Sequence, residues 1–322
     1  MHLVTIDDVA GGSPGARLRS GAVLHLGRAA RSGTIESWVP RRVLDILEGG
    51  DEAIDLVRRI VDRAEEGAAT DELFHRGAIL APDARLLAPV PEPRMVVAAG
   101  LAYKSHLAEM SGTPTPPHPT AFMKSAASIA SPHGILPLPA QASDALDYEG
   151  ELACVFGRAC HAVSPEDAMA CVAGFTVAND LSARDWVKPV WAATAPWEAR
   201  LTWEVNVMGK QFPGFTPLGP ALVTADEIED VTALGLTTRL NGTIMQQAPI
   251  GDMIFSIAEV IAHLSRWYQF RPGDVLLTGT PAGVGVGRSP PVFLKAGDVI
   301  EVQIERIGLI STRIASPVPD TH

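Results

Sequence analysis

The spacing of apolar residues along the chain has two periods, and each period predicts a different element. Between positions 54 and 64, apolar residues recur every three or four positions with charged residues between them. This spacing predicts an amphipathic helix that Asp51 caps. Between positions 300 and 305, apolar residues alternate with Glu and Gln, which predicts a strand with one buried face. The chain therefore contains both helices and strands.

Further strands and helix starts follow from local patterns. Two sites have the residues of a helix N-terminus: Ser164 precedes Pro165, and Ser256 is followed three positions later by Glu259, the pattern of a capping box. Continuous apolar runs predict interior strands at 94–100, 151–156 and 174–178. Because strands dominate this interpretation, we predict a strand-rich α+β fold.

A cluster of prolines predicts where the chain divides. Positions 82, 89, 91 and 93 are all proline, a density that neither a helix interior nor a central strand accepts. We place a domain boundary there. Residues 1–90 then form a small N-terminal α/β domain, and residues 91–322 form the larger, catalytic domain.

Composition narrows the class of protein. The chain has 322 residues, 47% of them hydrophobic, and a net charge of −11. Such an acidic chain is not expected to bind nucleic acid or an anionic membrane surface. No apolar run reaches the ~18 residues of a membrane span, and the N-terminus lacks the pattern of a secretory signal. The odd, sparse set of Cys154, Cys160 and Cys171 is typical of reduced thiols. We predict a cytoplasmic protein.

Three carboxylates carry the first chemical signal. Glu149 and Glu151 are two apart, so on a strand their side chains share a face, and Asp180 ends a second apolar run. Neighbouring anions repel each other unless a proton or a cation lies between them. Carboxylate oxygens suit Mg²⁺ or Mn²⁺. On spacing alone, a solvated strand edge is the more usual explanation of such a pair.

Two further motifs lie elsewhere in the chain. His106 and Glu109 are three apart, so on a short helix they can form a hydrogen-bonded pair able to activate water, although a surface pair has the same spacing. Residues 277–285 are predicted to form a glycine-rich turn in which Gly279 and Thr280 could donate hydrogen bonds to an anion. An ordinary β-turn would have the same residue pattern.

Together these motifs resemble the fumarylacetoacetate hydrolase family. The resemblance covers about residues 95–314, and it depends on the order and spacing of segments that are individually unspecific. These segments are Tyr103…His106…Glu109, Phe122…Lys124, Asp147-Tyr-Glu-Gly-Glu-Leu152, Ala178-Asn-Asp-Leu-Ser-Ala-Arg-Asp-Trp186, Gly209-Lys210…Pro217-Leu-Gly-Pro220, Met253-Ile-Phe255, Pro272-Gly-Asp274 and Thr278-Gly-Thr-Pro-Ala-Gly-Val-Gly285.

The resemblance implies a fold and a site. It implies a mixed β-sandwich roll, usually a homodimer, with Mg²⁺ or Mn²⁺ (Ca²⁺ being a further candidate) on the residues matching Glu149, Glu151 and Asp180. By position, Lys210 matches the family's active-site lysine, and His106 with Glu109 matches its lid-borne dyad. Substrate contacts are expected from Thr280 with Gly279, Tyr103, Lys124 and Arg184. Arg184 is alternatively a structural partner of Asp185.

The implied activity is metal-dependent hydrolysis or decarboxylation that cleaves a carbon–carbon bond in a small β-dicarbonyl acid. The alternatives are a lyase or isomerase of the same fold, such as a sugar-acid dehydratase with a Schiff base on Lys210 or a 2-oxo acid tautomerase, and a non-catalytic homologue. The chain departs from the family pattern at Ala102, where asparagine is common, and across residues 191–207. Both departures leave the substrate open.

Overall fold

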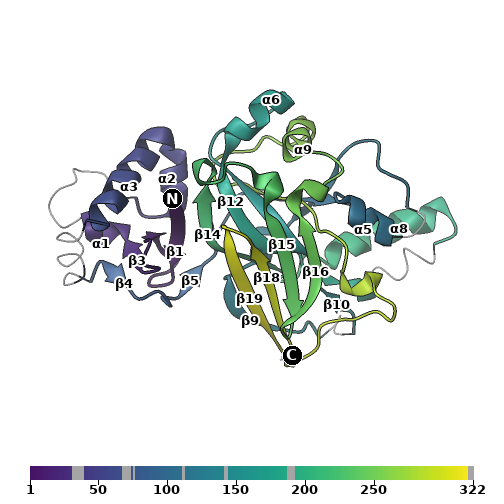
Figure 1. Cartoon of the computed structure of the whole chain (residues 1–322). Coiled ribbons are helices and arrows are strands. Elements are labelled where there is room, and N and C mark those ends of the chain that lie inside the picture. Colours follow the sequence, from purple (N-terminus) through teal and green to yellow (C-terminus); the bar gives the residue numbers. More distant parts are fainter. Residues whose placement is uncertain are drawn as a thin grey trace.

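The computed structural model describes residues 1–30, 40–66, 74, 77–110, 113–140, 144–186 and 193–317, with the side chains of all of these except 201–205. One large mixed sheet runs through the molecule in the order β4-β3-β2-β1-β14-β12-β11-β17-β6-β7, and β5 and β8 pair with β1 and β14 (Figure 1). Its strands are β1 (His2–Ile6), β2 (Ser13–Arg17), β3 (Val23–His25), β4 (Ile79–Leu80), β5 (Leu86–Leu87), β6 (Val96–Gly100), β7 (Thr120–Lys124), β8 (Ile129–Ala130), β11 (Gly150–Phe156), β12 (Val172–Asn179), β14 (Thr216–Thr224) and β17 (Val275–Leu277).

A second sheet packs beside the first and carries the C-terminal strands. Its order is β16-β15-β18-β19-β9, and a short pair, β10 with β13, lies apart from both sheets. The strands are β9 (His133–Pro137), β10 (Leu146–Asp147), β13 (Ser182–Ala183), β15 (Gly235–Leu240), β16 (Thr243–Pro249), β18 (Val299–Ile304) and β19 (Gly308–Ala315). The predicted half-buried strand is β18. The predicted strand-rich α+β fold is confirmed.

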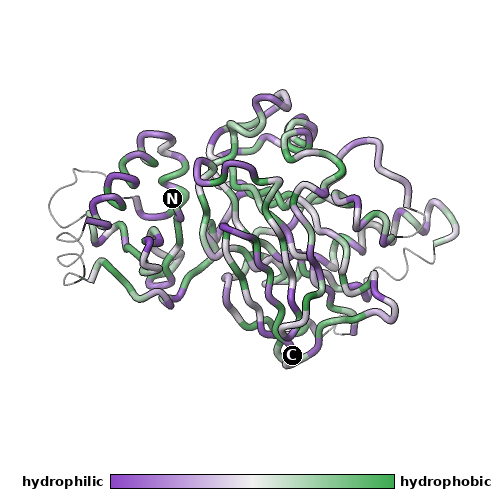
Figure 2. Tube along the Cα trace, in the orientation of Figure 1, coloured by the Kyte–Doolittle hydropathy of each residue, from purple (hydrophilic) through white to green (hydrophobic). Residues whose placement is uncertain are grey.

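Helices cover the outside of the sheets (Figure 1). They are α1 (Leu26–Ala30), α2 (Val43–Glu48), α3 (Gly50–Ala64), α5 (Lys104–Glu109), α6 (Pro165–Ala168), α8 (Pro196–Met208) and α9 (Ile257–Leu264). Figure 2 shows hydrophilic and hydrophobic residues alternating around α3, as its spacing predicts. Within the described ranges, no helix is long and apolar enough to cross a membrane.

The hydrogen bonds at the N-termini of α9 and α3 show which predicted helix caps form. Ser256 Oγ accepts a hydrogen bond from the amide of Glu259 at 3.3 Å, and the Glu259 carboxylate accepts one from the Ser256 amide at 2.7 Å. This capping box is confirmed. The predicted cap at Asp51 is wrong: α3 begins at Gly50, and the Asp51 carboxylate instead pairs with Arg158 at 2.7 Å.

The interior strand β11 is buried along its whole length because the sheet is covered on both faces. Leu152, Cys154 and Phe156 belong to one apolar cluster, whereas Ala153 and Val155 belong to another. Alternate residues of a strand face opposite sides, so β11 stabilises two cores at once. This explains why its sequence is an uninterrupted apolar run.

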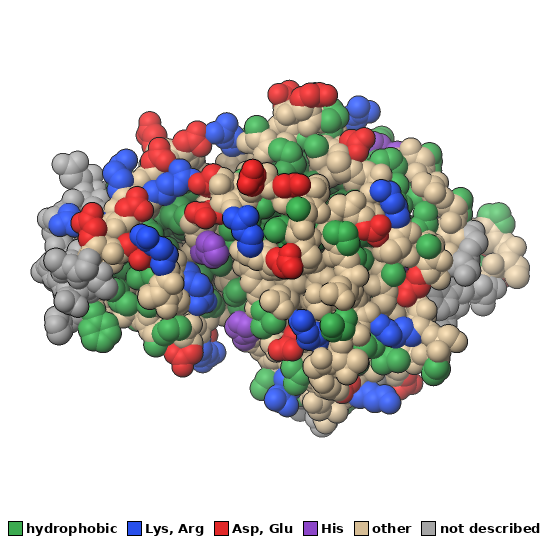
Figure 3. Space-filling view, in the orientation of Figure 1, with side chains coloured by type: hydrophobic (Ala, Val, Ile, Leu, Met, Phe, Trp, Pro, Cys, Tyr) green, Lys and Arg blue, Asp and Glu red, His purple; other side chains and the backbone are tan. Residues whose placement is uncertain are grey.

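The N-terminal strands join the same large sheet. Leu3 of β1 pairs with Leu222 of β14, and both side chains lie in one apolar cluster. The division of the chain near residue 90 therefore stays a prediction about domains, while hydrogen bonds and a shared core link the two parts. On the face shown in Figure 3, Lys and Arg side chains are interspersed with Asp and Glu.

This shared core gives a stability prediction. We expect Leu3→Ala to lower the free energy of unfolding of the whole chain by about 2–5 kcal/mol, because Leu3 is fully buried and its truncation leaves a cavity. Urea denaturation followed by tryptophan fluorescence measures it. The control Val9→Ala, at an exposed position, should change stability by less than about 0.5 kcal/mol. Equal losses for the two variants would contradict the packing.

Candidate active site

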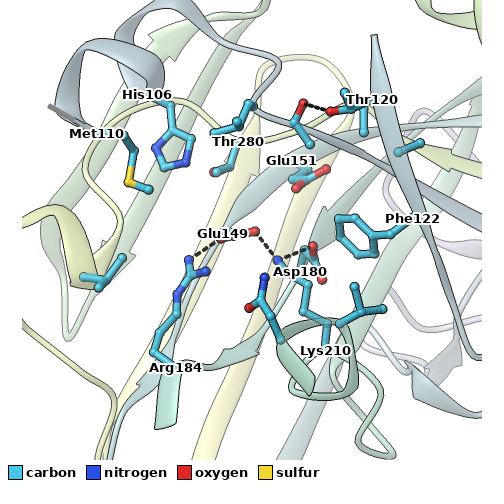
Figure 4. Close-up of a pocket in the computed structure, with 17 residues that line it drawn as sticks. His106, Met110, Thr120, Phe122, Glu149, Glu151, Asp180, Arg184, Lys210 and Thr280 are labelled. Carbon is cyan, nitrogen blue, oxygen red and sulfur yellow. Dashed lines mark hydrogen bonds and ion pairs between the residues drawn. The ribbon is translucent and has the colours of Figure 1, made fainter. Parts of the chain in front are cut away.

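A cavity of about 210 Å³ opens beside the ends of β6, β11 and β12 (Figure 4). Its polar end carries Glu149, Glu151, Asp180, Arg184 and Lys210. Apolar residues line much of the remaining wall, where His106, Thr120, Asn206 and Thr280 also lie: Ala99, Leu101, Met110, Ala121, Phe122, Val207 and Val286. A largely apolar cavity with a few convergent polar groups is the usual form of a small-molecule site.

Strand pairing brings the three predicted carboxylates together. β11 and β12 are antiparallel, with Gly150 opposite Asn179, so the start of one strand meets the end of the other. The amide of Asp180 donates to the carbonyl oxygen of Glu149 at 2.8 Å. Carboxylate oxygens of Glu149, Glu151 and Asp180 lie within 4.8 Å of one another, and all three residues are buried. They could hold a divalent metal ion.

The environments of the two glutamates differ. Burial alone would raise the pKa of Glu149, but Lys210, whose Nζ lies 2.7 Å from its carboxylate, and Arg184 outweigh burial and hold this pKa below its ordinary value. Burial, followed by the charges of Asp180 and Glu149, raises the pKa of Glu151 well above the ordinary value. The Gly279 amide donates to Glu151 at 2.7 Å, but no cationic side chain among the described residues pairs with it.

The charges of the cluster test whether a metal ion fits. Around the polar end lie four buried carboxylates and three cationic side chains: Asp147, Glu149, Glu151 and Asp180 against Lys124, Arg184 and Lys210. One negative charge within this cluster is therefore unmatched. The donors facing the cavity are hard carboxylate oxygens, which suit Mg²⁺ or Mn²⁺. A divalent ion would reverse the net charge and favour an anionic substrate.

Lys210 follows the C-terminus of α8 and is held by two of the carboxylates. Its Nζ lies 2.7 Å from oxygens of both Glu149 and Asp180 and 5.2 Å from the ring centre of Phe122. Burial would lower the pKa of Lys210, but the charges of Asp180 and Glu149 raise it overall. A Schiff-base nucleophile must be neutral, so these ion pairs favour an electrostatic role over the dehydratase chemistry.

His106 and Glu109 form a pair at the other side of the cavity. Both lie on the short helix α5, and His106 Nδ1 is 3.2 Å from a Glu109 oxygen. The second Glu109 oxygen accepts a hydrogen bond from the Gly283 amide at 3.0 Å. His106 is buried and lines the cavity, as Figure 4 shows. Because Glu109 holds Nδ1, the other ring nitrogen is left for a ligand.

Arg184 also lines the cavity, but its partners differ from the predicted one. Its Nε donates to Asp147 at 2.9 Å, and its guanidinium also pairs with Glu149. The alternative of an ion pair with Asp185 is wrong, because the Asp185 carboxylate accepts from the Ala145 amide instead. Arg184 thus orients Glu149 from the side opposite Lys210.

Comparison with known proteins agrees with this arrangement. Residues 95–315 match the family model described as fumarylacetoacetate (FAA) hydrolase C-terminal. The chain belongs to the fumarylacetoacetate hydrolase family. The human mitochondrial oxaloacetate tautomerase FAHD2A is 39% identical over 86% of this chain and 80% of its own length. Oxaloacetate tautomerase YisK of Bacillus subtilis is 34% identical over 86% and 87%.

Solved structures show the same family fold. A putative HpcE protein from Mycobacterium smegmatis has a TM-score of 0.75 and 32% identity, covering 98% of this chain and 99% of that one. The fumarylacetoacetate hydrolase from Exiguobacterium antarcticum has a TM-score of 0.75 and 28% identity, with coverage of 98% and 99%. The predicted family fold is therefore confirmed.

Two residues that the family resemblance suggests as substrate contacts lie behind the cavity wall. The Nζ of Lys124 is fully buried and donates to Asp180 and to the carbonyl oxygens of Lys210, at 2.8 Å, and Phe215, at 3.3 Å. Its three N–H groups are thus used within the protein. Tyr103 is also fully buried, and its backbone forms an isolated antiparallel β-bridge with Met253. Because neither side chain reaches the cavity, the structure favours a supporting role for both.

Gln246 supports the glycine-rich turn from the second sheet. Its Nε2 donates to Thr280 Oγ1 at 2.7 Å, and its Oε1 accepts from the Gly150 amide at 3.0 Å. Thr280 Oγ1 in turn donates to the Gly150 carbonyl oxygen at 2.9 Å. Thr280 lines the cavity, but its hydroxyl is already engaged within the protein, and its contact with a substrate stays a prediction. No sequence pattern marked Gln246, since it occupies an ordinary strand position.

Asp147 opens the segment that contains both glutamates, and its spacing in the sequence indicates none of its contacts. Its buried carboxylate accepts hydrogen bonds from the amides of Gly285 at 2.6 Å and Val286 at 3.2 Å, in addition to its ion pair with Arg184. Burial raises the pKa of Asp147 despite this arginine. Asp147 thus connects the glycine-rich turn to the arginine that orients Glu149.

The uncompensated carboxylate gives a prediction. A carboxyl whose pKa is raised by folding costs stability when ionised, at pH values above its ordinary pKa. Glu151→Gln should therefore leave the melting temperature of the metal-free protein at pH 7.5, in EDTA, unchanged or higher than wild type. The rise in melting temperature that Mn²⁺ produces in the wild type should be lost, because a ligand oxygen loses its charge.

Differential scanning fluorimetry with EDTA or Mn²⁺ measures both effects. Glu52→Gln is the matched control at an exposed position and should behave as wild type. A Glu151→Gln protein that is less stable in EDTA and still gains stability from Mn²⁺ would contradict the assignment.

Proposed function

We propose that this chain interconverts the keto and enol forms of a short 2-oxo dicarboxylic acid of the oxaloacetate type. The observation that carries the proposal is the position of His106. It is buried, held by Glu109, and on the same cavity as the three carboxylates and Lys210. A single base beside a polarised oxo acid is what enolisation requires.

The cationic residues bind and orient the substrate. Lys210 and Arg184 place positive charge beside the carboxylates at the polar end, where the 2-oxo and carboxylate oxygens of the substrate would lie. A divalent metal ion held by Glu149, Glu151 and Asp180 would supply Lewis-acid polarisation of the 2-oxo group. The apolar wall formed by Phe122, Val207 and other residues limits access of water to the enol.

His106 moves the proton. In the keto form it removes a proton from C3, the electrons of that C–H bond form the C2–C3 double bond, and the 2-oxo oxygen becomes an enolate oxygen. Lys210 stabilises that charge. The oxygen takes a proton from water to give the enol, and the His106 imidazolium returns its proton to water, so there is no net proton change. The reverse sequence returns a proton from His106 to C3. Glu109 stabilises the imidazolium that forms in each direction.

The relatives support this choice among the family's activities. Human FAHD2A and Bacillus subtilis YisK are both named oxaloacetate tautomerases, and each aligns with more than four-fifths of this chain. The small cavity agrees with a four-carbon substrate. Location in the cytoplasm and assembly as a homodimer remain predictions.

Carbon–carbon bond cleavage, which the family resemblance implied first, is the second candidate. It is supported by the His106–Glu109 pair, which can equally deprotonate an attacking water, and by the Exiguobacterium relative named fumarylacetoacetate hydrolase. The two candidates differ in their products, since tautomerisation releases neither pyruvate nor carbon dioxide.

The expected outcome is enzyme-catalysed decay of enol-oxaloacetate absorbance in the presence of Mg²⁺ or Mn²⁺, above the uncatalysed rate and without pyruvate formation. His106→Gln should lower the catalysed rate roughly 100- to 10,000-fold, because proton transfer is lost. His118→Gln, at an exposed histidine, should match wild type. If pyruvate appears with each turnover, or if His106→Gln keeps its rate, the proposal fails in favour of cleavage or of another base.

A further inference from the structure

The two cationic side chains on the cavity wall are already paired with carboxylates. Arg184 is shared between Asp147 and Glu149, and Lys210 between Glu149 and Asp180. These groups can bind the reacting end of a substrate at the polar end of the cavity. The far end of a dicarboxylic acid needs a different hydrogen-bond donor.

Asn206 is a cavity-lining side chain with unused hydrogen-bonding capacity. It lies in the last turn of α8 and borders the cavity next to Val207. Its amide oxygen is buried and has no hydrogen-bond partner among the residues that the structure describes. A buried amide oxygen without a partner is costly, by about 1–3 kcal/mol, and calls for an explanation such as a ligand.

The backbone fixes Asn206 relative to Lys210. The amide of Gly209 donates to the carbonyl oxygen of Asn206, and the amide of Lys210 to that of Val207, each at 3.1 Å. The Gly209 carbonyl oxygen accepts from the Ala183 amide at 2.9 Å, and a Cβ on Gly209 would lie 2.8 Å from the Ala183 carbonyl oxygen. The turn is therefore held tightly against β13, so both side chains are presented to the cavity at a set spacing.

From this placement we propose that Asn206 is a specificity-determining residue that donates a hydrogen bond from its side-chain amide to the distal carboxylate of a 2-oxo dicarboxylic acid. The inference rests on the proposed function and extends it to substrate choice. The amide can turn by 180° to present its NH₂ group. Being neutral, it adds no charge to a cluster whose ion pairs are already formed.

The chemistry predicts discrimination against monocarboxylic acids. A substrate that ends in a methyl group would leave the Asn206 amide unpaired in a water-poor cavity, and sites built around a hydrogen bond reject analogues that lack the partner. Asn206 belongs to the segment 191–207, where the sequence departs from the family pattern. A substrate preference particular to this chain is expected from such a position.

The test uses two 2-hydroxy acids that cannot enolise, L-malate with a distal carboxylate and L-lactate without one. Their dissociation constants are measured by titration calorimetry on the full chain with Mn²⁺. Wild type should bind malate more tightly. Asn206→Leu, which keeps the shape of the side chain, should weaken malate binding roughly 10- to 100-fold and lactate binding less than about threefold.

Two further variants sharpen the result. Asn206→Asp places a negative charge against the distal carboxylate, so it should weaken malate binding more than Asn206→Leu does. Met208→Leu, exposed on the same helix, is the matched control and should change neither ligand. Circular dichroism spectra identical to wild type establish that each variant is folded.

Equal weakening of malate and lactate by Asn206→Leu, an unchanged malate preference, or a wild type without that preference would each overturn the inference. Neither ligand is turned over, so this outcome is independent of the tautomerase assay. If wild type tautomerises oxaloacetate while Asn206→Leu keeps the malate preference, the role of Asn206 falls and the proposed function stands. If the preference shifts but no tautomerase activity is found, the proposed function alone falls.

Discussion

Repulsion among carboxylates buried at the junction of β11 and β12 is the constraint around which the site is organised. Antiparallel pairing of these strands forces Glu149, Glu151 and Asp180 into one small volume. Burial strengthens the repulsion, since little water is present to screen it. Cationic side chains from other parts of the chain form ion pairs with Glu149 and Asp180: Lys124, Arg184 and Lys210. Glu151 is left with a single backbone donor.

Each compensating group is itself fixed by a neighbour, so the site is a connected network. Asp147 holds Arg184 and two amides of the glycine-rich turn, while Lys124 holds Asp180 and the backbone of Lys210. Gln246 joins that turn to β11 from the second sheet. Networks of this kind keep reacting groups in one geometry, because displacing any member leaves another buried charge or donor without a partner.

The sequence predicted the parts of this protein that depend on short-range pattern. The strand β18, the helix α3 and the capping box at Ser256 follow from period and residue type, which local sequence carries. Local spacing indicated that Glu149 and Glu151 share a strand face and that His106 and Glu109 share a helix face. Motif order was needed to join Asp180 to the glutamates, because no local rule says that Asp180 meets Glu149.

Other features depended on tertiary contacts that sequence spacing does not encode. Lys124 was expected to contact the substrate. In the extended strand β7 its side chain instead lies behind Asp180, where the backbone carbonyl oxygens of Lys210 and Phe215 accept hydrogen bonds from its Nζ. Gln246 and Asn206 carry no motif at all. Asp51 has the residue type of a helix cap, but α3 begins one residue before it, at Gly50, and its carboxylate pairs with Arg158, over a hundred residues away.

The pairing of β1 with β14 also has a consequence for any protein of this family that lacks the N-terminal strands. In this chain β14 has β12 on one side, and β1 pairs with its C-terminal part on the other, at Leu222 and Val223. A version of the protein without the N-terminal strands would bare one edge of β14 together with the apolar surface that Leu3 covers. Exposed sheet edges of this kind pair readily with other chains. In this chain the N-terminal strands cover that part of the edge, and any architecture lacking them must cover it in another way.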